Sequence, residues 1–176
     1  WEYVADTVMG GVSTGGLNVE RYNGRDAVVL RGDVSTENNG GFVQMASDLA
    51  GGAIYDASAW GGIEIEVAGN SEVYDLRLRT PQLSRPWQSF RADFVATGEW
   101  QTLSIPFAAF EPNNTTATLD RAQLQRIGIL GVGRAFADFL AAYAASGDRL
   151  AELHESRSGC GRDARADLAA RRASRL

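Results

Sequence analysis

Apolar and polar residues alternate along several segments of this chain, and that period of two restricts what the chain can fold into. Residues 63–67, 74–79 and 90–94 each place apolar side chains on one side and mostly charged side chains on the other. Such alternation is typical of antiparallel strands with one buried and one solvated face. Shorter apolar runs predict further, more central strands, at residues 27–30, 42–45, 103–105 and 127–130.

Turn signals such as Asn23-Gly24, Gly69-Asn70 and Thr97-Gly98 separate these runs. We expect about eight or nine short strands without intervening helices, a pattern that indicates a β-sandwich or jelly roll. The sequence therefore predicts an all-β, antiparallel β-sandwich domain over residues 1–133.

The pattern changes after Gly133. Residues 135–155 are rich in Ala and Leu, with Phe136, Phe139, Leu140 and Tyr143 at helical spacing, and a second Ala/Arg-rich stretch covers about residues 163–175. Both stretches contain good helix formers. We therefore expect residues 134–176 to form an Ala/Arg-rich helical tail outside the sandwich.

Two pairs of glycines mark unusual turns, within residues 8–13 and 37–42. Doubled glycine beside Asn or Ser indicates backbone with positive φ or close approach by another group. We expect the two turns to meet at one end of the domain. The first would be supported by Asp6 and Ser13, and the second by Asn38 and Asn39.

Composition excludes several classes of protein. The formal net charge of −5 argues against a nucleic-acid groove. No apolar stretch approaches the roughly 18 residues that span a bilayer, so we expect no transmembrane segment. One cysteine allows no intrachain disulfide and favours a reducing compartment. All 17 basic residues are arginine, which suggests a GC-rich bacterial gene and a cytoplasmic protein.

Catalytic and metal chemistry find little support. His154 and Cys160 are the single members of their residue types, too few for a triad or a transition-metal site. Asp33, Glu37, Asn38 and Asp56 could ligate calcium, but such residues more often cap turns. Residues 131–136 resemble a dinucleotide fingerprint with Phe136 at a position that needs Gly or Ala. We expect a non-enzymatic protein without metal or cofactor.

Aromatic residues near strand ends offer a recognition surface. Trp60, Trp87, Phe90 and Trp100 could stack on sugars or anchor a partner protein, although core packing explains any single one as well. Arg79 and Arg91 could add planar hydrogen-bond donors to the same surface, or lie on an ordinary exposed strand face.

Several short segments occur in a fixed order along the chain. They are Val8-Met9-Gly10-Gly11-Val12-Ser13, Glu37-Asn38-Asn39-Gly40-Gly41-Phe42, Leu78-Arg79-Thr80, Trp87-Gln88-Ser89-Phe90-Arg91-Ala92, Trp100, Ile105-Pro106-Phe107 and Arg126-Ile127-Gly128-Ile129-Leu130. Together they resemble the complex I intermediate-associated protein 30 family over residues 1–133. The resemblance implies a galactose-binding-like β-sandwich. It also implies a binding protein, since mitochondrial members are assembly factors for respiratory complex I.

The tail departs from this resemblance. Family members usually add a further strand after the segment that matches Arg126–Leu130, whereas residues 134–176 read as helix. We hypothesise that the tail is frameshifted or replaced, and that one sheet then lacks a strand.

Two functions remain open. The first is a binding or scaffold protein with a protein partner, such as respiratory-complex subunits, and the second is a module that binds a sugar or another polar small molecule. Both would use the glycine-pair loops with nearby side chains. The candidate binding residues are Met9, Gly10, Gly11, Asn38, Asn39, Arg79, Trp87 and Arg91.

Overall fold

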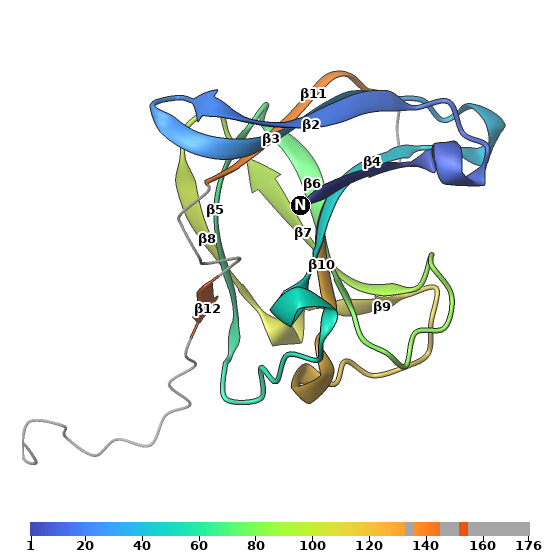
Figure 1. The fold of residues 1–176 in the computed structure, drawn as a ribbon, viewed down its shortest axis with the longest axis vertical. Helices are drawn as coiled ribbons and strands as arrows, with labels where there is room; N and C mark the ends of the chain where they lie inside the picture. Colours follow the sequence, from blue (N-terminus) through green and yellow to red (C-terminus); the bar gives the residue numbers. More distant parts are fainter. Residues whose placement is uncertain (133–135, 145–151, 155–176) are drawn as a thin grey trace, which may run out of the picture.

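Two antiparallel sheets form the molecule in the computed structural model, which describes residues 1–132, 136–144 and 152–154. Sheet A has the order β1-β4-β10-β6-β7-β9 and sheet B the order β12-β5-β11-β3-β2, with β8 paired to the other edge of β5. Figure 1 shows β2, β3 and β11 across the top of the molecule and β5 and β8 at its left. The all-β sandwich predicted from alternation is confirmed.

The strands have the following bounds. Sheet A contains β1 (Glu2–Ala5), β4 (Phe42–Asp48), β10 (Arg126–Val132), β6 (Glu72–Arg79), β7 (Ser89–Ala96) and β9 (Glu111–Asn113). Sheet B contains β12 (Glu152–His154), β5 (Gly62–Gly69), β11 (Phe136–Ala144), β3 (Arg25–Val34), β2 (Thr14–Tyr22) and β8 (Gln101–Pro106).

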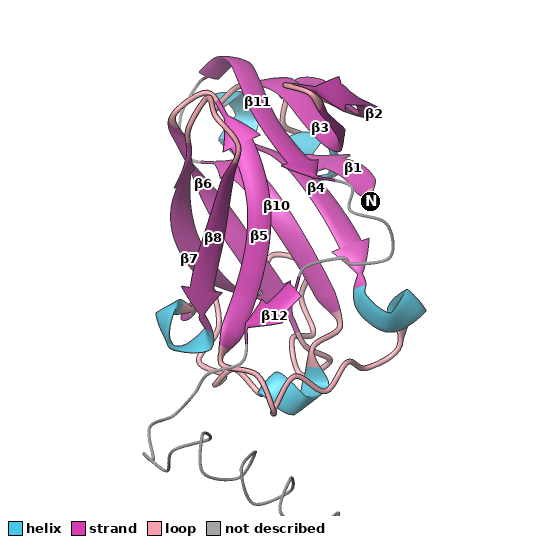
Figure 2. Cartoon of the chain, turned by 90° about the vertical axis from the view of Figure 1, so that its left-hand side faces the viewer, coloured by secondary structure: helices cyan, strands magenta, loops and turns pink. Residues whose placement is uncertain are grey.

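Short 3-10 segments lie in the connections between strands (Figure 2). Each spans three or four residues, namely η1 (Asp6–Met9), η2 (Glu37–Asn39), η3 (Leu49–Gly52), η4 (Phe107–Ala109) and η5 (Arg121–Gln123). The strands therefore provide the frame, and the short helical segments shape the turns.

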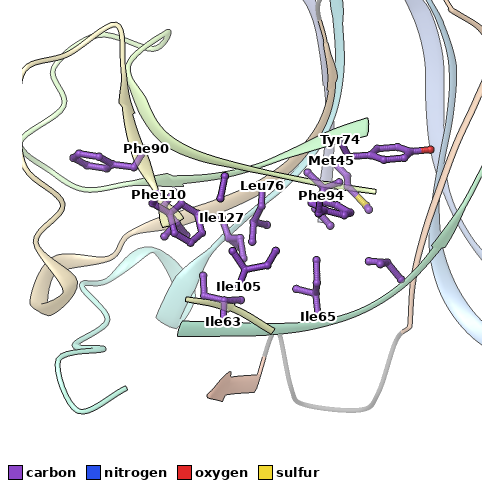
Figure 3. Close-up of a cluster of buried hydrophobic side chains, with 14 of the residues drawn as sticks. Met45, Ile63, Ile65, Tyr74, Leu76, Phe90, Phe94, Ile105, Phe110 and Ile127 are labelled. Carbon is purple, nitrogen blue, oxygen red and sulfur yellow. The ribbon is translucent and has the colours of Figure 1, made fainter. Parts of the chain in front are cut away.

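The core lies between the two sheets and is filled by the apolar members of the alternating segments (Figure 3). Tyr74, Leu76 and Leu78 of β6 are fully buried, as are Ile63 and Ile65 of β5. The intervening residues of β6, β7 and β10 consequently point to the outer face of sheet A. That outer face is where the candidate site lies.

The expected helix over residues 135–155 is wrong where the structure describes it. Residues 136–144 form β11, which pairs with both β3 and β5, and β12 pairs with the start of β5. Two strands with open edges offered backbone partners that outweighed the local helix propensity of an Ala/Leu-rich run. The tail hypothesis predicted that one sheet lacks the strand that follows Arg126–Leu130. In the structure, β11 follows β10 and is part of sheet B. The second predicted helix, over residues 163–175, lies outside the described residues.

The two glycine-pair turns meet at the buried carboxylate of Asp6. Asp6 Oδ1 accepts a hydrogen bond from Ser13 N (3.0 Å), and Oδ2 accepts bonds from Ser13 Oγ (2.5 Å) and Gly41 N (2.5 Å). Phe42 N donates a longer bond to Oδ2 (3.3 Å). The expectation that the two turns come together is confirmed, and Asp6 is the residue that joins them.

Glycine is required where the backbone passes closest to this carboxylate. A Cβ atom built on Gly11 would lie 2.3 Å from Asp6 Cγ, and one built on Gly40 would lie 2.5 Å from Asp6 Oδ2. Neither distance is compatible with a side chain at those positions. One member of each glycine pair is therefore explained by the close approach of Asp6.

The pKa of Asp6 reflects this arrangement. Burial alone would raise it, but the hydrogen bonds donated by Ser13, Gly41 and Phe42 outweigh burial, so the pKa lies below the ordinary aspartate value. A lowered pKa means that the stabilisation is complete above the pKa of the unfolded state. It is lost only as the pH falls through the folded-state pKa.

We predict that Asp6→Ala lowers the free energy of unfolding by about 2–4 kcal/mol, because buried N–H groups lose their acceptor. Urea denaturation at pH 7 measures this change. The control is Asp26→Ala, whose exposed carboxylate lies 3.9 Å from Arg21 and should contribute less than about 0.5 kcal/mol. Equal effects of the two substitutions would contradict the structural role of Asp6.

Candidate functional site

A cleft of about 480 Å³ opens on the outer face of sheet A. Strands β1, β4, β10 and β6 form its floor, and the connection between β6 and β7 borders it. It is lined by Val4, Gln44, Asp48, Arg77, Arg79, Ser84, Pro86, Gln88, Ser89, Gln125, Arg126, Ile127 and Gly128.

Gly128 makes room for a polar side chain on the cleft floor. It lies in β10, paired with Ala46 of β4 on one side and with Arg77 of β6 on the other. The side chain of Gln44 lies over it, since Gln44 Nε2 would be 2.3 Å from a Cβ built on Gly128. The glycine therefore lets an amide group rest against the backbone of the floor.

The border of the cleft is held by hydrogen bonds to the β6–β7 connection. Arg79 donates from one terminal nitrogen to the carbonyl of Pro86 (2.5 Å) and from the other to the carbonyl of Leu83 (3.2 Å). Gln82 Nε2, within this connection, donates to the carbonyl of Thr118 (2.8 Å), which lies in the segment between β9 and β10. Figure 1 shows β9 on the same side of the molecule as this connection.

Three arginines give the cleft its charge. Arg126 forms ion pairs with Asp48 (2.5 Å) and with Glu2. Arg77 Nη2 lies 2.9 Å from Asp75 Oδ2. Arg79 is aligned with Arg126 across neighbouring strands. Guanidinium groups stay charged and donate in a plane, so this floor suits ligands with oxygen acceptors.

A carboxyl pair lies beside the cleft, where Asp75 of β6 is paired with Asp93 of β7. Burial, and then the hydrogen bond and charge of Asp75, raise the pKa of Asp93, while Arg91 acts in the opposite direction. The side chain of Asp75 is buried and also lies 4.0 Å from Arg91. Two carboxyl groups in contact favour retention of one proton.

The structure separates the predicted site residues into two groups. Met9, Gly10, Gly11, Asn38 and Asn39 lie in the turns around Asp6, which bonds to Phe42 at the start of β4. Arg79 is instead aligned through Arg126 with Asp48 at the other end of β4. Those two ends are about 20 Å apart.

The second group lies at or beside the cleft. Arg79 lines it, and Trp87 stands between the lining residues Pro86 and Gln88, with 51% of its surface exposed. Arg91 is paired with the lining residue Arg77 and with Glu111. The sequence predicted a single surface that combines the glycine-pair loops with Trp87 and Arg91. In the structure these residues lie in two separate regions.

The other aromatic candidates have structural roles. Phe90 is fully buried and Trp60 packs against the core. Trp100 donates from Nε1 to the carbonyl of Tyr22 (3.2 Å). Of the four aromatic residues proposed for recognition, Trp87 is the one with a largely exposed side chain.

Other chemical readings of the sequence have no counterpart in the structure. Phe136 begins a strand rather than a helix, which removes the geometry of a dinucleotide fingerprint. Within residues 1–132, 136–144 and 152–154, no cluster of three or more His, Cys, Asp or Glu side chains is arranged to hold a metal ion. No helix in the part of the chain that the structure describes is long and apolar enough to cross a membrane.

Sequence reasoning missed most of the cleft, including Arg77, Arg126, Gln44 and Gly128. Alternation alone places Arg77 and Arg79 on the outer face of β6. Their proximity to Arg126 depends on the pairing of β6 with β10, which lie far apart in the sequence. The sequence alone does not give this pairing register, and so it did not predict the cleft.

We predict that Asp93→Asn stabilises the protein at pH 7, because it removes repulsion from Asp75. A raised pKa means that Asp93 favours folding most below its unfolded-state pKa, and that this contribution is lost as pH rises through the folded-state pKa. Asp93 as a whole residue remains exposed despite the partial burial that raises its pKa. Solvent therefore screens the repulsion, and the gain should be small, about 1–2 °C in Tm. This gain in Tm should disappear at about pH 3.5, below the ordinary aspartate pKa.

Thermal unfolding at the two pH values measures this change, with Asp26→Asn as the control that should show no gain. A loss of stability at pH 7 in Asp93→Asn would contradict the account.

Comparison with known proteins places the chain in a family. The family model for Complex I intermediate-associated protein 30 matches residues 1–141. A search of curated proteins gives no match.

Solved structures show a similar fold. The family 11 carbohydrate-binding module of cellulosomal cellulase Lic26A-Cel5E of Clostridium thermocellum has a TM-score of 0.68 at 13% identity, covering 89% of this chain and 88% of that one. A family 30 carbohydrate-binding module has a TM-score of 0.63 at 16% identity, covering 93% and 86%. At these identities the similarity concerns the fold alone.

The family match extends from residue 1 through β10 and into β11. Strand β11 lies in the segment that was expected to fall outside the family's domain. The glycine-pair turns, the arginine-bearing β6 and the Arg126–Leu130 segment of β10 all fall within it. The chain belongs to the complex I intermediate-associated protein 30 family.

Proposed function

We propose that this protein is a non-enzymatic binding protein that assists assembly of a respiratory membrane complex. Family membership and a fold shared with carbohydrate-binding modules support a binding or scaffold role. The family's name associates it with intermediates of complex I, which suggests complex I subunits as partners.

The observation that carries this proposal is the exposure of apolar side chains beside the cleft and in the turn around Asp6. Trp87 is 51% exposed beside the cleft, while Val8 and Met9 are 71% and 55% exposed in the turn around Asp6. Protein interfaces commonly combine apolar anchors with polar contacts. We propose that Trp87, Arg79 and Arg91 belong to one docking face at the cleft, and that Met9 belongs to a separate contact at the turns around Asp6.

The charged groups of the cleft suit binding better than catalysis. Arg77 and Arg126 are engaged in ion pairs, and Arg79 holds the β6–β7 connection. A guanidinium remains protonated and therefore does not serve as a general base. These side chains can orient a partner by donating further hydrogen bonds.

Affinity purification from a bacterium that contains respiratory complex I tests the proposal. We expect complex I subunits to be enriched with the tagged protein, and Trp87→Ala to reduce their recovery at least about fivefold, since buried Trp anchors dominate interface energies. The matched control is Val19→Ala, which removes an exposed apolar side chain, 77% exposed, from sheet B. The proposal would be contradicted if the tagged, unmodified protein recovered complex I subunits only at the background level.

A sugar-binding function is the second candidate. It is favoured by the fold, since one similar structure is a family 11 module in complex with a β-1,3-1,4-mixed-linked tetrasaccharide. The described residues that line the cleft include no aromatic side chain for stacking on a sugar ring. A thermal shift with this tetrasaccharide that is lost in Trp87→Ala would favour the sugar function, and no shift would favour the protein partner.

A further inference from the structure

Arg79 is distinguished among the cleft arginines by the neutral character of its partners. Arg77 and Arg126 lie beside carboxylates, whereas Arg79 donates to the backbone carbonyls of Leu83 and Pro86. Within the described residues, no carboxylate lies within ion-pair distance of Arg79. Its positive charge is therefore held in place without a counter-charge.

The surroundings make this charge costly unless an anion arrives. Arg79 is paired in register with Arg126, and like charges opposite each other destabilise a sheet. Burial, and then the charge of Arg126, lower the pKa of Arg79. Arg126 already has carboxylate partners in Asp48 and Glu2, so an anion bound at Arg79 would supply the counter-charge that Arg79 alone lacks.

Arg79 carries the one guanidinium charge among the three lining arginines that no ion pair offsets within the described residues. Arg77 is paired with Asp75, and Arg126 is paired with Asp48 and Glu2. A guanidinium without a carboxylate partner favours a ligand oxygen that carries negative charge. The expected ligand therefore carries a carboxylate or a similar oxygen anion that reaches Arg79.

The uncharged lining residues favour a polypeptide as the source of that carboxylate. Gln44, Gln88 and Gln125 line the cleft together with Ser84 and Ser89. Amide side chains both donate and accept, which matches the N–H and C=O groups of an extended peptide. An acidic sugar would lack an aromatic platform among the described lining residues.

We propose that this cleft binds an extended acidic segment of a protein, with Arg79 as the contact for an Asp or Glu carboxylate. The proposal rests on the proposed function in taking the partner to be a protein. It adds the chemistry of the segment that is recognised and the side chain that recognises it.

Isothermal titration of the purified full chain with synthetic peptides tests the proposal. The probe is the capped peptide acetyl-Gly-Glu-Gly-Glu-Gly-amide, and the matched probe carries Gln in place of both Glu residues. We expect the acidic peptide to bind at least about tenfold more tightly than its Gln counterpart. Its affinity should fall with added salt.

Two variants locate the contact. Arg79→Gln should weaken binding of the acidic peptide at least about tenfold. Because Arg79 also holds the β6–β7 connection, Gly128→Val provides a second test that keeps every charge. It displaces the Gln44 side chain from the cleft floor into the cleft, and it should weaken binding similarly. The control is Arg31→Gln, which removes a charge paired with Glu20 on sheet B and should leave binding unchanged.

Three outcomes would overturn the proposal. They are equal binding of the two peptides, unchanged affinity in both Arg79→Gln and Gly128→Val, and tighter binding of trigalacturonate, an acidic sugar, than of the peptide. Recovery of complex I subunits is measured separately, so peptide binding without such recovery would leave this proposal standing and count against the proposed function. Recovery of complex I subunits without peptide binding would leave the proposed function standing and count against the acidic-segment proposal.

Discussion

The carboxylate of Asp6 is the interaction on which the arrangement of this end of the sandwich depends. It accepts hydrogen bonds from Ser13, Gly41 and Phe42, and so joins two turns that are about thirty residues apart in the sequence. Ser13 Oγ also accepts a bond from Ser35 N (2.9 Å), which adds the end of β3 to the same point. One buried charge thus positions β1, β2, β3 and β4.

This explains why the glycine pairs belong to the architecture. Gly11 and Gly40 leave room for Asp6, and the anchored turns fix where β4 begins. From that start, the register of β4 with β10 and of β10 with β6 carries the alignment to Arg79 at the far end of the sheet. The outer-face cleft therefore depends on the same register that begins beside Asp6.

The sequence predicted the sandwich well because alternation reports directly on one buried and one solvated face. Segments such as residues 63–67 and 74–79 are strands with the expected faces buried. It failed at β11, where an apolar Ala/Leu-rich run has no period of two, and sheet edges decide its structure. It identified Arg79 but missed Arg126, because the contact between them depends on a long-range register.

The most direct test is an NMR titration that follows the side-chain carboxyl carbon of Asp6 together with the amide protons of Ser13, Gly41 and Phe42. We expect the Asp6 carboxyl to titrate with a midpoint below the ordinary aspartate pKa of about 3.9. The three amide signals should change with that same midpoint. An Asp6 midpoint at or above the ordinary value, or amide signals that change independently of the carboxyl carbon, would contradict this expectation.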